Sequence, residues 1–182
     1  MKRILSLSAL LLPSLTFAQD IYFTRSGEVI FYSETPMENI DAVNHKATSV
    51  IDLSSGKIEV SMLIKAFEFK KALMQEHFND DRYMDSGVYP KGEFKGTLTG
   101  ITAEDAKKPG KYDVTLEGDL DIHGVKQKRT IKGTIEVDGA GTLKTVCDFT
   151  VKCADHGINI PGGANVAEDI QVKAQMDLKK KI

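Results

Sequence analysis

Residues 112–122 read YDVTLEGDLDI and alternate between two kinds of side chain. The even positions carry apolar residues or glycine, and the odd positions carry threonine or a carboxylate. A period of two residues is typical of a β-strand with one dry face and one wet face. The wet face of this strand would hold four carboxylates, so we expect it to lie in water.

Segments with the same period lie on both sides of this strand. Residues 128–138 place Ile131, Ile135 and Val137 on one face and mostly lysine and threonine on the other. His123-Gly124 is a turn signal between the two segments, so their acidic and basic faces are predicted to pair across a hairpin. Strands are predicted at residues 21–24, 28–33, 46–53, 57–66, 92–102, 112–122, 128–138, 142–154 and 166–178.

One segment departs from this period. Phe67, Met74 and Phe78 share one face of a helix, and Leu73 is a good helix former. We predict a short helix at residues 70–78, followed by an irregular loop to Pro90. The apolar phase changes at Phe67, which indicates a bulge or the end of the preceding strand.

Strands with one apolar face, joined by short turns, predict an all-β protein. About eight such strands favour an eight-stranded antiparallel barrel with one short helix, and a β-sandwich is the second choice. The interior of such a barrel is just wide enough for side chains or for one ligand. A barrel of the outer-membrane type is excluded, because its charged strand faces would meet lipid at a cost of a few kcal/mol for each charge.

The first eighteen residues have the pattern of a secretory signal. Lys2 and Arg3 precede an apolar run, and Thr16-Phe17-Ala18 supplies small residues for cleavage. The run is shorter than the roughly 20 apolar residues that a membrane span needs. We therefore predict a signal peptide at residues 1–18, one domain at residues 19–182, and a periplasmic or secreted protein that does not span a membrane.

Charge and cysteine content narrow the choice of partners and chemistry. The 24 basic and 26 acidic side chains give a net charge of −2, so no nucleic-acid partner is expected. Cys147 and Cys153 lie six positions apart in one predicted strand, a span of about 20 Å that is too long for a disulfide. We expect two free, buried thiols.

The sequence carries no catalytic or metal-binding motif. Its histidines form neither H-E-x-x-H nor H-x-H, and neither C-x-x-C nor G-x-S-x-G occurs. Asp155-His156 is adjacent in sequence and is placed in a predicted loop, which does not make a catalytic pair. We expect no enzyme, no catalytic residue, no metal and no cofactor other than a bound lipid.

Two motifs stand out in the chain. The first consists of Glu76-His77-Phe78, Tyr83-Met84-Asp85, Tyr89-Pro90 and Phe94, and the second is GDLDIHGV at residues 118–125. The first resembles the signature region of the YceI-like family, and the second is similar to that family's hairpin pattern G-x-L-T-I-x-G-V-T. Asp121 and Lys126 replace the two threonines of the hairpin pattern, and Gln75 stands where the family often has arginine. The resemblance covers residues 19–182.

The resemblance implies a lipocalin-like barrel that holds a polyisoprenoid or another long-chain lipid, such as a prenol or an isoprenoid quinone. Its role would be transport, storage or stress protection. The alternative is a ligand-free interaction or stress-response protein with a solid barrel. The sequence leaves a homodimer open. No tryptophan occurs, which separates the chain from true lipocalins.

Thirteen side chains on predicted dry faces are expected to line the lumen, although each of them would also serve as core packing. His77 is a candidate contact for a lipid head group, or else part of a solvated helix end. Phe67, Phe69, Met74 and Phe78 are expected either to gate one end of the barrel or simply to dock the helix. The predicted lumen residues are Val60, Met62, Phe69, Phe78, Phe94, Leu116, Leu120, Ile135, Phe149, Val151, Ile170, Val172 and Met176.

Overall fold

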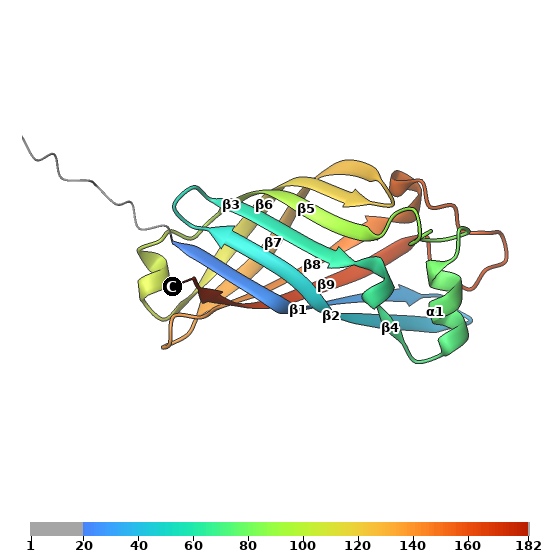
Figure 1. Ribbon diagram of the computed structural model, residues 1–182, viewed down its shortest axis with the longest axis horizontal. Coiled ribbons are helices and arrows are strands. Elements are labelled where there is room, and N and C mark those ends of the chain that lie inside the picture. Colours follow the sequence, from blue (N-terminus) through green and yellow to red (C-terminus); the bar gives the residue numbers. More distant parts are fainter. Residues whose placement is uncertain (1–19, 182) are drawn as a thin grey trace, which may run out of the picture.

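The computed structural model describes residues 20–181, and the predicted signal peptide lies outside them. Figure 1 shows an elongated barrel of strands with helix α1 (Ala72–Asn79) at one end. Short 3-10 helices are η1 (Ile64–Ala66), η2 (Asp105–Lys107) and η3 (Cys153–His156). The strands are β1 (Ile21–Glu34), β2 (Asn39–Asp52), β3 (Lys57–Leu63), β4 (Glu68–Phe69), β5 (Lys91–Thr99), β6 (Gly110–Ile122), β7 (Val125–Val137), β8 (Leu143–Lys152) and β9 (Asp169–Lys180).

Eight of these strands form a closed ring in which every neighbouring pair is antiparallel. The order is β1-β9-β8-β7-β6-β5-β3-β2, and pairing of β1 with β2 closes it. Closure removes the unpaired edges through which open sheets aggregate. The short strand β4 adds to β2 at Ala42 and Val43. The predicted eight-stranded antiparallel barrel with a short helix is therefore confirmed, with one extra strand.

The hairpin of β6 and β7 forms as its sequence predicts. Val114, Leu116 and Leu120 are buried, while the carboxylates between them reach the surface. His123 has φ 54° and Gly124 has φ 72°, which is the left-handed backbone of a tight two-residue turn. The predicted pairing of acidic and basic faces is confirmed by an ion pair between Lys128 Nζ and Asp119 Oδ1 at 3.1 Å.

The first two strands are longer than predicted. β1 is continuous through Gly27, where the register with β2 shifts, whereas the sequence predicted two separate strands. A Cβ atom on Gly27 would lie 2.0 Å from Sδ of Met176, so a larger residue here would require this methionine to move. β2 begins at Asn39, seven residues earlier than predicted, because its first half pairs with the second half of β1.

The predicted end of a strand before Phe67 is confirmed, because β3 ends at Leu63 and η1 follows it. The predicted helix at residues 70–78 is also found, as α1. The predicted loop at Asp155-His156 is wrong: β8 ends at Lys152, both residues belong to η3, and His156 is fully buried. Burial of a backbone segment favours a hydrogen-bonded turn over an open loop.

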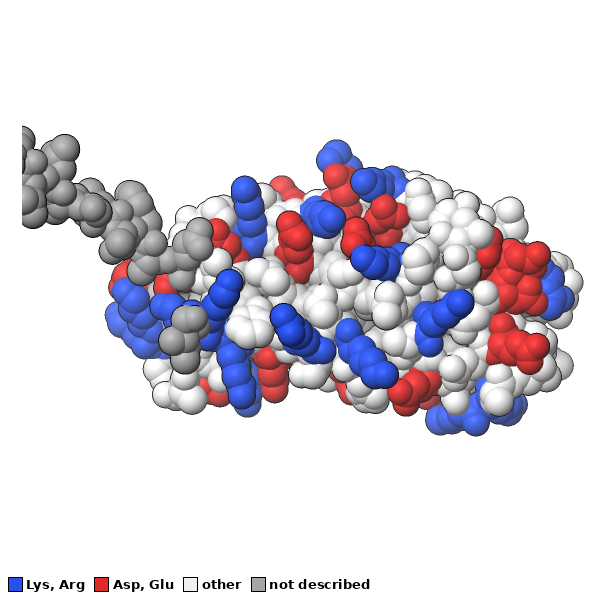
Figure 2. Space-filling view, viewed as in Figure 1, with Lys and Arg blue, Asp and Glu red and all other residues white. Residues whose placement is uncertain are grey.

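The barrel wall separates an apolar interior from a charged exterior. Figure 2 shows acidic and basic side chains interspersed over the visible face, with no large area of one sign along the wall. Inside, Ile51, Ile135, Leu143 and Leu178 are at most 1% exposed. Within residues 20–181, no helix is both long enough and apolar enough to cross a membrane.

Candidate functional site

Two adjoining apolar spaces lie inside the barrel, and we call them the outer lobe and the inner lobe. The outer lobe has a volume of about 340 Å³, and the inner lobe has a volume of about 80 Å³. Five side chains line both lobes and therefore mark where they meet. We call these five the collar: Val29, Met62, Leu120, Phe149 and Val172.

The outer lobe lies at the end of the barrel that carries α1. Its walls include the hairpin of β1 and β2, helix α1 and the segment 158–166. Its few polar lining residues include Glu38, His77, Tyr83 and Asn165. Glu38 is neutralised by Lys71, whose Nζ lies 2.8 Å from its Oε1. An apolar molecule would thus find apolar walls inside and polar groups on the rim.

Four phenylalanines attach the helix to the barrel. The ring centroid of Phe78, in α1, lies 5.4 Å from the ring centroid of Phe31, 5.6 Å from that of Phe67 and 5.0 Å from that of Phe69. Offset and edge-on contacts at such distances are favourable for aromatic rings. No residue of α1 is itself fully buried, so this cluster is its main apolar attachment. All four rings also line the outer lobe.

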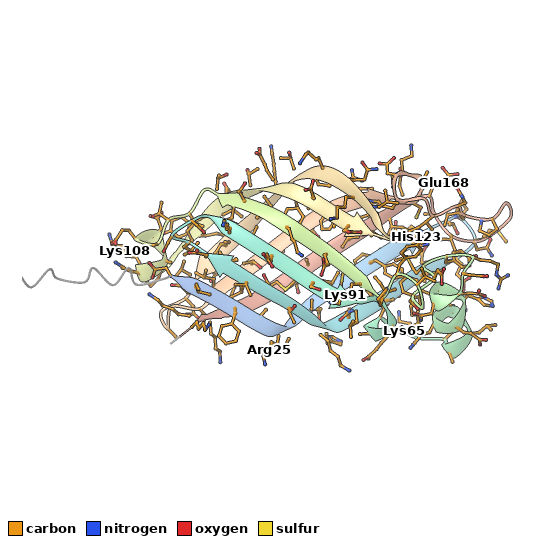
Figure 3. All side chains as sticks on the ribbon, turned by 45° about the horizontal axis from the view of Figure 1, so that its top comes forward. Arg25, Lys65, Lys91, Lys108, His123 and Glu168 are labelled. Carbon is orange, nitrogen blue, oxygen red and sulfur yellow. The ribbon has the colours of Figure 1, made fainter. Side chains whose placement is uncertain are left out.

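Buried side chains lie between the inner lobe and the far end of the barrel. The turns that follow β2, β5 and β7 lie at the far end of the barrel, where Leu53, Ala106 and Leu143 are buried. Figure 3 places Lys108 at this end, opposite His123 and Glu168. Buried side chains occupy the barrel beyond the inner lobe, and the larger lobe of the lumen lies toward α1.

Every side chain predicted to line the lumen lies on one of the lobes, and His77 is exposed on the rim of the outer lobe. The outer lobe has Phe69, Phe78, Val151 and Ile170; the collar has Met62, Leu120, Phe149 and Val172; the inner lobe has Val60, Phe94, Leu116, Ile135 and Met176. Sequence reasoning missed several lining residues, among them Val29 of the collar, Phe31 and the segment 158–166. The alternation in residues 28–33 contains a signal for Phe31, but the segment 158–166 has no period.

Each lobe contains one cysteine. Cys147 lines the inner lobe and is half-buried, whereas the sequence predicted a buried thiol; Cys153 lines the outer lobe and is buried, as predicted. Both thiols are free. Burial, followed by the charge of Asp148, raises the pKa of Cys147 to about 11. Burial likewise raises the pKa of Cys153 to about 11. Both sulfurs are therefore protonated and poor nucleophiles at neutral pH.

The wall next to the outer lobe has a gap in its strand pairing, which η3 covers. β7 pairs with β8 only over Gly133–Val137, so residues 125–132 have no strand partner on that side. Instead, Gln127 Nε2 donates to the carbonyl of Asp155 at 2.6 Å, and His156 Nδ1 donates to the carbonyl of Val125 at 3.0 Å. η3 thus completes the wall with polar contacts.

The site contains no arrangement that points to catalysis. Across the described part of the chain, residues 20–181, no three His, Cys, Asp or Glu side chains lie close enough to hold a metal ion. The two thiols are protonated and lie in different lobes. The side chains that line the two lobes form an apolar surface on which an apolar molecule could be buried away from water.

A closed antiparallel barrel with an apolar lumen open at one end defines a lipocalin-like barrel protein. The profile of the YceI-like domain matches residues 25–178, and the chain belongs to this family.

A relative of the chain matches about two thirds of its length. A UPF0312 protein of Shewanella denitrificans is 27% identical over an alignment of 132 residues that covers 66% of this chain and 64% of that protein. The chain thus matches slightly less than two thirds of that relative's length.

Two solved structures share the fold. A polyisoprenoid-binding domain from Saccharophagus degradans has a TM-score of 0.75 and 11% identity, and the match covers 90% of this chain and all of that domain. BcnA of Burkholderia cenocepacia has a TM-score of 0.69 and 15% identity, and the match covers 85% of this chain and 96% of that one.

Proposed function

We propose that this protein is an exported carrier that binds the apolar chain of a polyisoprenoid, or of another single-chain lipid, in its lumen. The outer lobe carries the proposal: it is an apolar space of about 340 Å³ inside the barrel of a small protein. This volume lies within the range of about 300–1,000 Å³ that is usual for small-molecule sites. A solid barrel would fill this space with side chains, which is why we favour a ligand over a ligand-free interaction protein.

Burial of an apolar chain in this lumen would supply enough free energy for binding. Each buried CH₂ group contributes about 0.8 kcal/mol, so a five-carbon isoprene unit contributes at most about 4 kcal/mol. Micromolar affinity requires about 8 kcal/mol net of the cost of association. A few buried isoprene units would therefore give useful affinity without a charged partner in the lumen. The description of the Saccharophagus domain as polyisoprenoid-binding supports the same ligand class.

Native mass spectrometry of protein purified without detergent tests the proposal, followed by organic extraction and mass analysis of what is released. We expect a bound species of several hundred daltons that contains a prenyl or acyl chain. Protein that carries no such species, and that also ignores added prenols and quinones, would refute the carrier function. Because an expression host supplies its own lipids, the extraction is repeated from the natural source.

The variant Val151→Glu tests whether the lumen is the binding site. Val151 is 5% exposed and lines the outer lobe, so a carboxylate there would oppose an apolar chain. We expect loss of the bound species from protein that keeps its β-sheet circular dichroism spectrum. Val50→Glu is the matched control, because Val50 is 44% exposed on the outer wall. Retention of ligand by folded Val151→Glu protein would exclude the outer lobe.

A further inference from the structure

The collar divides the lumen at a fixed depth. Its side chains come from β1, β3, β6, β8 and β9, so they reach inward from most of the circumference of the barrel. Leu120 is buried, and Phe149 presents an aromatic ring to both lobes. The lobe beyond the collar is small, about 80 Å³ against about 340 Å³. The volume of the inner lobe therefore leaves room for the end of one apolar chain at most.

The inner lobe has the properties of a stop for an apolar chain. It is lined almost wholly by apolar side chains, including Leu116 and Ile135, and Ile135 is 0% exposed. Beyond it, the side chains of Leu143 and Leu178 at the far end of the barrel are also 0% exposed and occupy the interior there. A chain that enters from the outer lobe can advance only until its tail fills the inner lobe.

From this geometry we propose that the lumen measures the length of its ligand's apolar tail, and that the residues around the inner lobe set the measured length. The proposal rests on the proposed carrier function. The ligand is then a lipid with a single narrow tail, inserted tail first through the collar, with its polar end at the rim beside His77. A two-chain phospholipid does not pass the collar, and a long polyisoprenoid leaves its remaining units in water.

Binding of linear prenols of increasing length to delipidated protein tests the proposal. Each isoprene unit that finds a place in the lumen is expected to lower Kd by about tenfold or more. Units added after the lumen is full gain no buried surface, so Kd levels off at a defined length. An affinity that rises with the same slope along the whole series would overturn the proposal.

Two substitutions at the inner lobe are expected to change, in opposite directions, the prenol length at which Kd levels off. We call this length the break. Ala174 lines the inner lobe between Val29 and Cys147 in the strand register, so Ala174→Leu fills part of it. Leu116→Ala enlarges the lobe. We expect the break at a shorter prenol in the first variant and at a longer one in the second. Geraniol, which fits within the outer lobe, is expected to bind both variants as tightly as wild type.

A control variant on the outer wall and a photolabelling experiment distinguish failure of the length measurement from failure of the carrier function. Val50→Leu enlarges an apolar side chain on the outer wall. It is expected to leave unchanged the prenol length at which Kd levels off. A prenol that carries a photoreactive diazirine at its tail end is expected to label residues 133–147. Labelling confined to residues 153–170, or an unmoved break in both variants, would overturn the length measurement while leaving the carrier function intact. Wild-type protein that binds no prenol of any length would instead refute the carrier function itself.

Discussion

Gly96 and Gly118 face each other across β5 and β6 at a point where the two backbones approach closely. A Cβ atom on Gly118 would lie 2.3 Å from the carbonyl oxygen of Lys95 and 2.6 Å from Cα of Gly96. Real side chains do not make contacts this short with backbone, so the strands would have to separate. Glycine at these positions is thus required by packing, although it interrupts the apolar face of residues 112–122.

Gly118→Ala is therefore expected to destabilise the protein by about 1–3 kcal/mol, the usual range for an overpacked interior. For a domain of this size, each kcal/mol lowers Tm by about 2–4 °C. Thermal unfolding followed by circular dichroism measures the change. Gly139→Ala is the control, because a Cβ atom on Gly139 meets nothing within 4 Å. Equal Tm values for the two variants would contradict the close approach.

At the scale of single elements, η3 depends on one buried histidine. His156 is 0% exposed, and its Nδ1–H donates to Val125, while its own carbonyl accepts a hydrogen bond from His123 Nδ1 at 3.3 Å. Burial lowers the pKa of His156, and the positive charge of Arg129 lowers it further. Hydrogen bonding to the Val125 carbonyl and the charge of Asp155 act in the opposite direction. The histidine is therefore held in its neutral form.

The lowered pKa makes stability depend on pH in a definite direction. As pH falls below about 6.5, the unfolded chain binds a proton at His156 before the folded chain does. The stabilisation is fully present above that pH and is lost as pH falls through the folded-state pKa. Between pH 7.5 and 5, the free energy of unfolding is expected to fall by up to about 1.4 kcal/mol per pH unit within this window.

His156→Asn is expected to flatten this dependence, because asparagine keeps a donor near the position of Nδ1 and does not titrate. Urea unfolding at pH 7.5 and at pH 5 measures the slope in each protein. His77→Asn, at an exposed histidine on α1, is expected to leave the wild-type slope unchanged. If His156→Asn kept the full wild-type slope, the pH dependence would arise elsewhere.

At the scale of the whole molecule, the lumen links ligand binding to stability. A ligand that binds only the folded barrel stabilises it by mass action, by about 2.7 kcal/mol at a concentration of 100 times Kd. The same contacts that hold the chain also fill space that is otherwise without packing, between strands far apart in the sequence.

Removal of bound lipid is therefore expected to lower the Tm of the wild-type protein, and added farnesol is expected to restore it. Differential scanning calorimetry before and after delipidation measures both steps. The Tm of Val151→Glu protein is expected to stay the same with and without farnesol. A wild-type Tm that does not respond to farnesol at any concentration would show that the folded barrel does not bind it.

Most of the fold could be predicted because β-sheet structure leaves a local signal. Alternation in residues 112–122 and 128–138 fixed which side chains face inward, and this assignment did not require knowledge of their neighbours. The same rule placed Val60, Met62 and Leu116 on the interior. The helix was predictable because it breaks the alternation. Strand ends moved, as at Asn39, where pairing with β1 extends β2 beyond its own pattern, and the strands predicted at residues 21–24 and 28–33 are one strand, β1. The extra strand β4 and the short helix η3 were not predicted.

The sequence by itself determined that the strands have one dry face, that this face turns inward, and that the charged faces meet water. These properties follow from a two-residue period, which any stretch of the chain carries locally. Only the tertiary structure decided that the interior contains space, that the collar divides it, and that η3 completes the wall between β7 and β8. Empty volume has no local signal, because it depends on how side chains from eight strands fit together across the barrel.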